Sequence, residues 1–245
     1  IDVMRGKIDH SIILSEAKEN IYYQKITNLG KPMRAFHNWL KSILIYTFIN
    51  IGYDLDGKKV NVLDIGVGRG GDLMKMYYGG QINQFIGIDI DNNGLISPVD
   101  GALSRYNQLR KKHPNFPRMY FVQADGGVLL NHDDQSKALS GMSQINKKLM
   151  EQFFSKDPNK RMKFQRVNCQ FVVHYFFKSE ISWNNFTQNL NDYLEPGGYL
   201  LLTTFDADRI VDALGDKDSY TVHYTDEKGE KHIYFDIKKE YSGIK

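Results

Sequence analysis

The sequence predicts an α/β protein built on a doubly wound, largely parallel sheet, and two observations carry that prediction. After the first sixty residues, short β-branched or aromatic runs alternate with helical patterns, which is typical of parallel strands joined by helices. A Gly-rich turn follows the first of these runs and places a ligand site at the carboxyl ends of the strands. The 245 residues, 41% hydrophobic and 25% charged, suit a single domain over 1–245.

Each expected strand is a short apolar run that a polar or Gly-rich turn ends. These runs are Val60–Ile65, Gln84–Asp89, Met119–Ala124, Arg166–Phe171 and Tyr199–Thr204. The expected helices between them carry apolar residues at three-four spacing. They are Gly71–Tyr78, Gly101–Lys112, Gly141–Phe154, Ser182–Leu194 and Ala207–Leu214, with Pro196-Gly197-Gly198 ending the fourth.

Three further segments complete the expected organisation. Residues 15–50 predict helices that close the ligand site, because Phe36, Trp39 and Ile43 share one stripe with two leucines. Residues 128–165 are expected to form an insertion. Near the end, two strand-like runs flank Asp226-Glu-Lys-Gly229, which predicts a hairpin. The hairpin should add antiparallel strands at one edge, giving a mostly parallel seven-stranded sheet with helices on both faces.

Composition excludes several classes of protein. The net charge of only +3 sets up no global field for a polyanion, so a nucleic-acid role must come from local basic patches. No apolar run reaches membrane-spanning length, so no membrane partner is expected. The lone Cys169 leaves no internal disulfide or cysteine cluster, and no His, Cys and Asp residues show metal-ligand spacing, so no metal is expected. These features predict an intracellular protein, and the first residue, Ile1, suggests a piece of a longer polypeptide.

The most informative segment is Asp64-Ile-Gly-Val-Gly-Arg-Gly-Gly-Asp72, directly behind an apolar run. With Asp89 at the end of the next strand, it also matches the dinucleotide fingerprint loosely. However, Asp64 stands two residues before the first glycine, where it would repel a pyrophosphate. S-adenosylmethionine has no phosphate and carries an ammonium and a sulfonium, so carboxylates suit it. The turn therefore favours a methyl donor over a dinucleotide.

The chain resembles the mRNA cap guanine-N7 methyltransferases, which are class I methyltransferases, over nearly its whole length. The resemblance is carried by Arg34-Ala-Phe-His-Asn-Trp-Leu-Lys41, the Gly-rich turn, Gly87-Ile-Asp-Ile90, Cys169-Gln-Phe-Val-Val-His-Tyr175 and Leu194-Glu-Pro-Gly-Gly-Tyr-Leu-Leu-Leu-Thr-Thr204. The Gln-Phe-x-x-His-Tyr block is the most specific. The long stretch between Asp125 and Gln170 is more similar to the capping enzymes of large DNA viruses than to cellular ones.

The resemblance implies a set of donor-binding residues. Lys41 matches a lysine that meets the donor's carboxylate, while Asp64 and Asp72 face its ammonium side. Asp89 matches the acid on the ribose, and Asp125 the acid beside the adenine amino group. The remaining members of this set are Gly66, Gly68, Gln170 and Tyr175. The product would be S-adenosyl-L-homocysteine.

Cap recognition falls, by the same resemblance, to His174 and Tyr175 at guanine and to Arg69 and Arg105 at the triphosphate. His37 stands where the family has an asparagine that touches the cap. Two replacements in the Gly-rich turn also depart from the family, since Arg69 replaces a lysine and Val67 a cysteine. A Glu and a Tyr of the family's cap pocket are expected after Lys245 and have no counterpart here.

Methylation at guanine N7 requires little chemistry from side chains. The N7 lone pair is free near neutral pH and attack releases no proton, so no residue is required as acid or base, and His174 and Tyr175 act by placement. Ribose 2′-O transfer would need a lysine-centred base, and the sequence shows no such arrangement. Two alternatives remain open: another class I methyltransferase with a 2′-O or small-molecule substrate, and a non-catalytic subunit that binds RNA or a partner.

The expected partner is 5′-capped RNA, with triphosphatase and guanylyltransferase domains in the same polypeptide. A viral enzyme would act in the host cytoplasm and the virion, and a cellular one in the nucleus.

Overall fold

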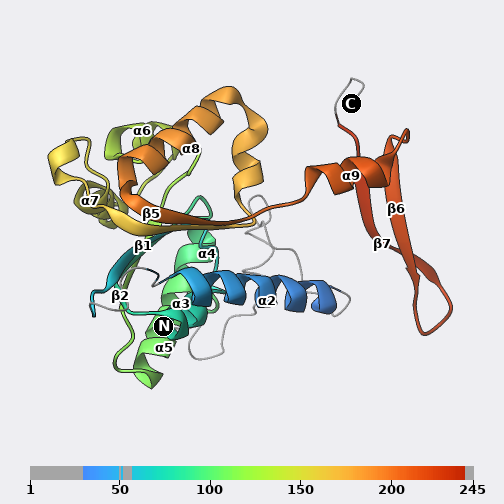
Figure 1. Cartoon of the computed structure of the whole chain (residues 1–245), viewed down its shortest axis with the longest axis horizontal. Helices are drawn as coiled ribbons and strands as arrows, with labels where there is room; N and C mark the ends of the chain where they lie inside the picture. The colour runs from blue at the N-terminus through green and yellow to red at the C-terminus, as the bar shows by residue number, and fades with distance from the viewer. Residues whose placement is uncertain (1–29, 50, 52–56, 241–245) are drawn as a thin grey trace.

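The fold is seen in a computed structural model that describes residues 30–49, 51 and 57–240. The expected helices of residues 15–29 lie outside this range. A five-stranded parallel sheet forms the centre of the molecule, in the order β3-β2-β1-β4-β5 (Figure 1). Its strands are β1 (Val60–Ile65), β2 (Ile82–Asp89), β3 (Arg118–Gln123), β4 (Phe164–Gln170) and β5 (Leu194–Thr203).

The strand order reverses between β1 and β4, which are neighbours in the sheet. Chain connections leave this point in opposite directions, so the loops at the carboxyl ends of β1 and β4 separate and open a crevice. β1 is buried on both faces, as its apolar residues require. The architecture thus places the Gly-rich turn, which follows β1, at the mouth of that crevice.

Helices cover both faces of the sheet and enclose two cores. On one face lie α2 (Lys31–Phe48), α3 (Leu73–Gly79), α4 (Asn92–Ile96) and α5 (Ala102–Lys112), around Phe85, Met76 and Tyr106. On the other face lie α6 (His132–Ala138), α7 (Gln144–Phe153) and α8 (Glu180–Tyr193), around Phe154, Phe164 and Phe186. Figure 1 shows α6, α7 and α8 above the sheet, and α2, α3 and α5 below it.

The segment expected as an insertion is built into the second core. Met150, Phe153 and Phe154 are buried there, and α6 forms where no helix was expected. Two short 3-10 helices, η3 (Pro158–Lys160) and η4 (Val173–Lys178), were also missed because they span too few residues to show a period. α7 begins three residues later than predicted, because the Ser143 hydroxyl accepts the Asn146 N–H and caps it there.

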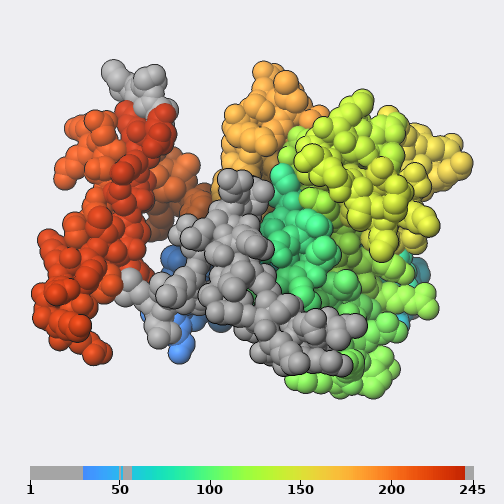
Figure 2. All heavy atoms as spheres, turned by 180° about the vertical axis from the view of Figure 1, so that it is seen from behind, coloured from blue at the N-terminus to red at the C-terminus, as the bar shows by residue number. Residues whose placement is uncertain are grey.

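The prediction of a seven-stranded sheet was wrong. β6 (Ser219–Thr225) and β7 (Lys231–Lys238) form the expected antiparallel hairpin, but in the described residues they make a separate two-stranded sheet. The hairpin and α9 (Ala207–Leu214) stand away from β5 at one end of the molecule (Figures 1 and 2). The Asp226–Gly229 turn specifies only the pairing of the two strands that it joins, so the sequence does not say which edge they reach.

Within the described residues, no helix combines the length and apolar character needed to cross a bilayer.

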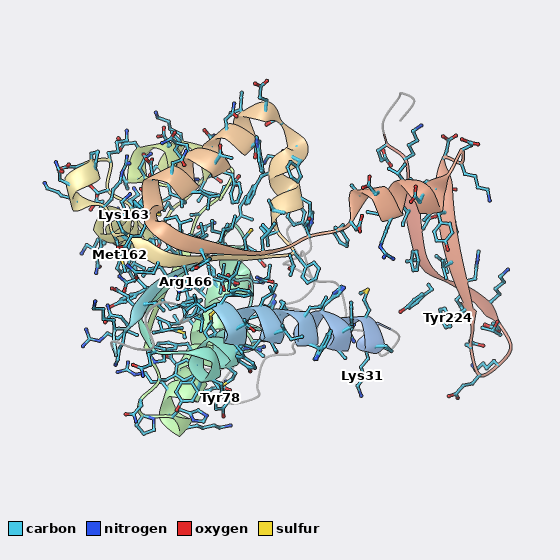
Figure 3. All side chains as sticks on the ribbon, in the orientation of Figure 1. Lys31, Tyr78, Met162, Lys163, Arg166 and Tyr224 are labelled. Atoms are coloured by element: carbon cyan, nitrogen blue, oxygen red, sulfur yellow. The ribbon has the colours of Figure 1, made fainter. Side chains whose placement is uncertain are left out.

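A buried arginine fastens α2 to the sheet. Arg166, in the middle of β4, is fully buried between the sheet and the carboxyl end of α2 (Figure 3). Its Nε donates to the Phe48 carbonyl at 2.7 Å, and Nη2 donates to the Ile51 carbonyl. The guanidinium also lies 4.8 Å from the ring centroid of Tyr199. Arginine suits this position because its five N–H donors satisfy several carbonyls beyond the last helical turn.

We expect Arg166→Met to lower the free energy of unfolding by about 2–4 kcal/mol, because the carbonyls of Phe48 and Ile51 lose the donor of a fully buried guanidinium. Arg209→Met, which removes an arginine of 87% exposure, is the matched control and should change stability by less than about 0.5 kcal/mol. Urea unfolding followed by circular dichroism measures both. Equal midpoints for Arg166→Met and wild type would contradict the role assigned to this side chain.

Candidate functional site

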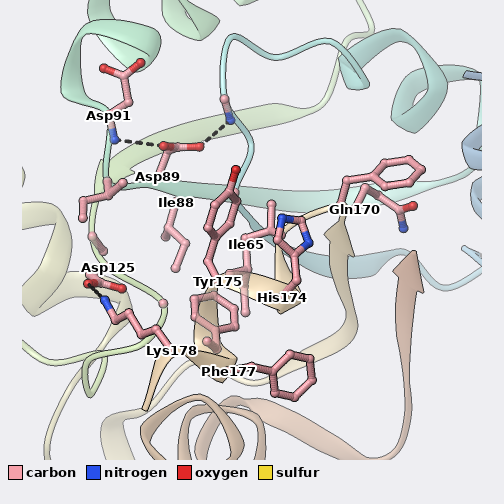
Figure 4. A pocket seen from close by; sticks show the side chains of 18 of the residues that line it. Ile65, Ile88, Asp89, Asp91, Asp125, Gln170, His174, Tyr175, Phe177 and Lys178 are labelled. Carbon is pink, nitrogen blue, oxygen red and sulfur yellow. Dashed lines mark hydrogen bonds and ion pairs between the residues drawn. The ribbon is translucent and has the colours of Figure 1, made fainter. Parts of the chain in front are cut away.

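A pocket of about 690 Å³ opens at the carboxyl ends of β1, β2, β3 and β4 (Figure 4). It has the size and position of a cofactor site in an open α/β sheet. Nine residues predicted from the sequence line it: Lys41, Gly66, Gly68, Arg69, Asp89, Asp125, Gln170, His174 and Tyr175.

The Gly-rich turn needs glycine for two different reasons. Gly66 has φ +80, and a Cβ there would come within 2.3 Å of the Val172 side chain across the crevice. Gly68 has φ +54, and its N–H donates to the Asp89 carboxylate at 2.7 Å. The turn therefore lies close to the loop after β4 and is tied to the end of β2.

Asp89 is held with both carboxylate oxygens in use. Oδ2 accepts the Gly68 N–H, and Oδ1 accepts the Asp91 N–H at 2.9 Å (Figure 4). Burial raises the pKa of this carboxyl, while the two backbone donors oppose the rise. Each oxygen keeps a second lone pair, so Asp89 can accept from two neighbouring hydroxyl groups at once.

Asp125 is fixed through its own backbone. Its N–H donates to Gln135 Oε1 and its carbonyl accepts from Gln135 Nε2, both at 2.9 Å. Gln135 is fully buried on α6. One carboxylate oxygen accepts the Gly127 N–H at 2.7 Å, and the other lies 3.9 Å from Lys178 Nζ. The second oxygen of Asp125 thus faces the exposed side chain of Lys178 at the edge of the pocket.

Lys41 reaches the pocket from α2 and is oriented by Asp72. Its Nζ lies 2.8 Å from Asp72 Oδ2, and Lys75 Nζ lies 2.8 Å from Asp72 Oδ1. Asp72 itself does not line the pocket. Two lysines share one carboxylate, so this corner carries a net positive charge suited to an anionic group.

Asp64 is buried beneath the turn, with 4% of its surface exposed. Its Oδ1 accepts from Asn168 at 2.7 Å, Asn168 Oδ1 accepts from Gln170 at 2.8 Å, and Gln170 Oε1 accepts from the Thr203 hydroxyl at 2.9 Å. Burial, followed by repulsion from Asp72, raises the Asp64 pKa to about 7. A chain of hydrogen bonds thus crosses β1, β4 and β5 just below the pocket.

Aromatic rings form the opposite wall. The His174 ring centroid lies 4.3 Å from that of Tyr175 and 5.0 Å from that of Phe205. His174 Nδ1 is buried without a hydrogen-bond partner among the described residues, and burial lowers the pKa of this imidazole. Figure 4 places Tyr175 between Asp89 and His174. A neutral imidazole offers one donor and one acceptor to a flat polar ligand.

Phe171 belongs to this wall and has an unusual backbone. Its φ of +58 is the one positive value found for a non-glycine residue in the described chain. Two acceptors hold it there, since its N–H lies 3.0 Å from the Thr203 carbonyl and 3.1 Å from the Thr203 hydroxyl. The ring lines the pocket and lies 4.4 Å, centroid to centroid, from His37. Strained residues of this kind concentrate at binding sites.

Four predicted site residues lie outside the pocket lining. Asp64 and Asp72 stand behind the turn, and His37 packs on Phe171, where burial and then Lys41 lower its pKa. Arg105 lies on α5 and lines a second, smaller pocket. Arg69 connects the two, because it lines the main pocket and forms an ion pair with Asp100 of the second.

Sequence reasoning missed other lining residues, among them Phe171, Asp91, Phe177 and Lys178. Phe171 was inside a recognised motif, so its position could have been found. Phe177 and Lys178 lie on η4, and they were missed because this short 3-10 helix has no sequence signal of its own.

The hairpin also gathers three side chains that the sequence did not associate. Ligand atoms of Asp226, Glu230 and His232 lie within 4.8 Å of one another. The Asp226 carboxylate accepts from the Lys228 and Glu230 N–H groups and contacts His232 Nε2 at 2.9 Å. These contacts satisfy the carboxylate within the turn.

The sheet order, the Gly-rich turn after β1 and the acid that ends β2 define a class I methyltransferase fold of five parallel strands, with an added hairpin. A family model described as the mRNA (guanine-N(7))-methyltransferase domain matches residues 17–242. This chain therefore belongs to the mRNA (guanine-N(7))-methyltransferase domain family. The predicted family is confirmed.

Two relatives show how far the similarity extends. The chain is 45% identical over 221 residues to a "Probable mRNA-capping enzyme" of Acanthamoeba polyphaga mimivirus, covering 90% of this chain and 18% of the relative. It is 32% identical to the "mRNA cap guanine-N(7) methyltransferase" of Schizosaccharomyces pombe, covering 73% of this chain and 40% of the relative. The chain thus spans less than half the length of either relative. The viral relative agrees with the predicted similarity to capping enzymes of large DNA viruses.

Among solved structures, one similar chain is an S-adenosylmethionine-dependent methyltransferase from Clostridium acetobutylicum. It shares 13% identity at a TM-score of 0.46, covering 82% of this chain and 66% of that one.

The raised pKa of Asp64 makes stability depend on pH. Between about pH 4 and 7 the folded protein holds a proton on Asp64 that the unfolded chain has lost, so stability falls as pH rises through this window. Asp64→Asn keeps an oxygen for Asn168 and removes this dependence. In the donor-free protein, about two pH units of this linkage amount to about 2.7 kcal/mol, so we expect the Tm of Asp64→Asn to rise relative to wild type by about 5–10 °C between pH 5 and pH 8.

Thermal unfolding across that pH range is the measurement. Asp216→Asn, at an exposed position on the turn after α9, is the control and should follow wild type at every pH. A constant difference in Tm between Asp64→Asn and wild type would show that Asp64 is ionised throughout.

Proposed function

We propose that this domain transfers the methyl group of S-adenosylmethionine to N7 of the guanine cap of RNA, converting GpppN-RNA to m7GpppN-RNA. One observation supports the proposal most strongly. A single pocket joins an acid-lined wall, which suits the donor, to a neutral aromatic and imidazole wall, which suits a guanine ring.

The donor wall supplies groups of matching charge. Asp89 has two acceptor positions for the ribose hydroxyls, and Asp125 has an oxygen for the adenine amino group. Lys41, held by Asp72, offers a cation to the donor's carboxylate. The buried Asp64 below the turn stabilises a nearby cation through the low-dielectric interior.

The acceptor wall suits a flat base. The rings of Tyr175 and Phe205 flank His174, which presents a neutral imidazole. Guanine offers an acceptor at O6 and donors at N1 and N2, which a neutral histidine and a tyrosine can pair with. Arg69, at the edge of the pocket, carries the charge that a triphosphate requires.

These residues act by holding two reactants in line. Bound S-adenosylmethionine supplies an electrophilic methyl group on its sulfonium. Because N7 attack releases no proton, the protein needs no base, and placement alone is worth roughly 7–11 kcal/mol in well-oriented systems. Asp64 and Asp89 keep the donor side electrostatically complementary while the aromatic wall fixes the guanine plane.

Transfer to a ribose 2′-hydroxyl has less support. It needs a side chain to take the hydroxyl proton, and lysines serve in that role. Lys41 and Lys178 are the lysines that line the pocket among the described residues, and each lies beside a carboxylate, Asp72 or Asp125. Each lysine is thus directed at an acid rather than at the aromatic wall, where the acceptor would lie.

The site residues also argue against a non-catalytic subunit, since a scaffold that only binds RNA has no use for a complete donor wall. The chain spans 18% of the viral relative, which is named "Probable mRNA-capping enzyme". This supports the proposal that triphosphatase and guanylyltransferase domains accompany it in one polypeptide, which would act in the host cytoplasm and the virion.

One assay tests the function. The protein is incubated with methyl-labelled donor and either GpppA-RNA or m7GpppA-RNA, and the label is located by nuclease digestion. Label at N7 of the unmethylated cap, with none on m7GpppA-RNA, is the expected result. Label on m7GpppA-RNA alone would replace N7 with a 2′-O position.

For the donor, we expect Asp89→Ala to weaken S-adenosylhomocysteine binding by about 1.5–3 kcal/mol, because a charged acceptor of the ribose hydroxyls is lost. Isothermal titration calorimetry measures the change. Asp216→Ala, far from the turn in sequence and exposed, should bind like wild type. Unchanged affinity in Asp89→Ala would remove Asp89 from the donor site.

For the cap, we expect His174→Ala to lower kcat/KM for GpppA-RNA by about tenfold to a hundredfold, the loss of roughly 1–3 kcal/mol of base contact. Affinity for S-adenosylhomocysteine should stay near the wild-type value. Full activity of His174→Ala would falsify the guanine-binding role of this residue.

A further inference from the structure

A second pocket of about 320 Å³ lies beside the main one, between α3 and α5. Arg105, Gln108 and Leu109 of α5 form one side, and Met74 of α3 forms the other. The Gly-rich turn separates the two pockets, since Gly68 and Arg69 line the first, whereas Gly70 and Gly71 line the second. The second pocket therefore begins where the turn leaves the first.

An ion pair joins the two pockets. Arg69 lines the first, and its guanidinium contacts the Asp100 carboxylate, which lines the second. Asp100 also accepts from the Ser97 hydroxyl at 2.8 Å. A triphosphate attached to a guanine on the acceptor wall would pass Arg69 and compete with Asp100 for its guanidinium. Beyond Arg69 it would continue into the second pocket.

The lining of the second pocket matches one nucleoside. Met74, Val99 and Leu109 give apolar surface for a base, Gln108 supplies an amide, and Arg105 supplies a cation for a phosphate. The volume is at the lower end of the range for ligand pockets, roughly 300–1,000 Å³. It holds one nucleoside rather than a folded peptide or several bases.

Charge continues beyond the pocket in the same direction along α5. Lys112 lies on the same helical face as Arg105 and Gln108, at spacings of seven and four residues. The last turn of α5 also carries Arg110 and Lys111. A strand of RNA that leaves the pocket along this helix meets successive cations.

We propose that the second pocket binds the first transcribed nucleoside of the substrate, the residue joined to the cap by the triphosphate. The inference rests on the proposed function and deepens it: the domain recognises the cap and the nucleoside after it, so capped RNA should be preferred over free GTP. Gln108 and Leu109 then contact the base, while Arg105 meets its phosphate.

The test fills the second pocket with a larger side chain. It then compares methyl transfer to an acceptor that has a second nucleoside with transfer to one that has none. Gln108 is exposed, so Gln108→Trp places a ring in the pocket without disturbing the core, and Gln108→Ala is the milder variant. Asn107→Trp, exposed on the same helix and outside the pocket, is the control. N7 methyl transfer is measured with GTP and with the dinucleotide GpppA.

We expect Gln108→Trp to raise KM for GpppA roughly tenfold, equivalent to about 1.4 kcal/mol, with KM for GTP unchanged. Gln108→Ala should raise KM for GpppA by a smaller factor, and Asn107→Trp should give the wild-type KM for both acceptors. Equal effects on GTP and GpppA, no effect on either, or an effect seen only with longer RNA would each overturn the inference. If wild type labels N7 of GpppA-RNA but of neither GTP nor GpppA, the inference fails and the proposed function stands. If it labels N7 of none of the three, the proposed function itself fails.

Discussion

The hydrogen-bond chain from Asp64 through Asn168 and Gln170 to Thr203 is the constraint on which the rest of the site depends. It ties the carboxyl ends of β1, β4 and β5 together directly below the pocket. The loops that follow β1 and β4 leave the sheet in opposite directions, so side chains at these strand ends need contacts of their own to stay in place. This hydrogen-bond chain requires the Asp64 carboxylate to be buried at low dielectric, which is unfavourable. The burial is tolerated because each polar group of the hydrogen-bond chain is paired. It also fixes the position of the aromatic wall, because the Thr203 hydroxyl accepts the Phe171 N–H.

Two elements far from β1 in sequence complete the pocket by locking residues that the sheet alone does not fix. Arg166 binds carbonyls at the end of α2, and α2 in turn carries Lys41 to Asp72. On the opposite face, Gln135 of α6 binds both backbone groups of Asp125. The segment expected as an insertion therefore positions an acid that lines the pocket. Stability and binding are coupled here, because the buried side chains that hold the fold also aim the ligand-facing ones.

The sequence predicted most of the sheet and the pocket because strand ends and Gly-rich turns are local signals. The five parallel strands, the Gly66 turn and the Asp89 position all follow from short patterns that one strand and its turn contain. The remaining features depend on contacts between residues that lie far apart in the sequence. Nothing local says that the hairpin stays off β5, that Asp72 turns toward two lysines, or that Arg105 faces a pocket of its own. His37 packs on Phe171, which lines the pocket, a contact made across two elements, and its contact with the cap stays a prediction.

The left-handed backbone of Phe171 places opposing demands on one position. A glycine there would adopt φ +58 without strain, whereas the phenylalanine costs the fold on the order of 1 kcal/mol or more. Glycine would also remove the ring that lines the pocket. Selection for a more stable protein and selection for a closed aromatic wall therefore pull this residue in opposite directions. A search for heat-resistant variants should therefore return substitutions at position 171 that lower turnover. The residue found at this position indicates whether selection for stability or selection for a closed aromatic wall has dominated.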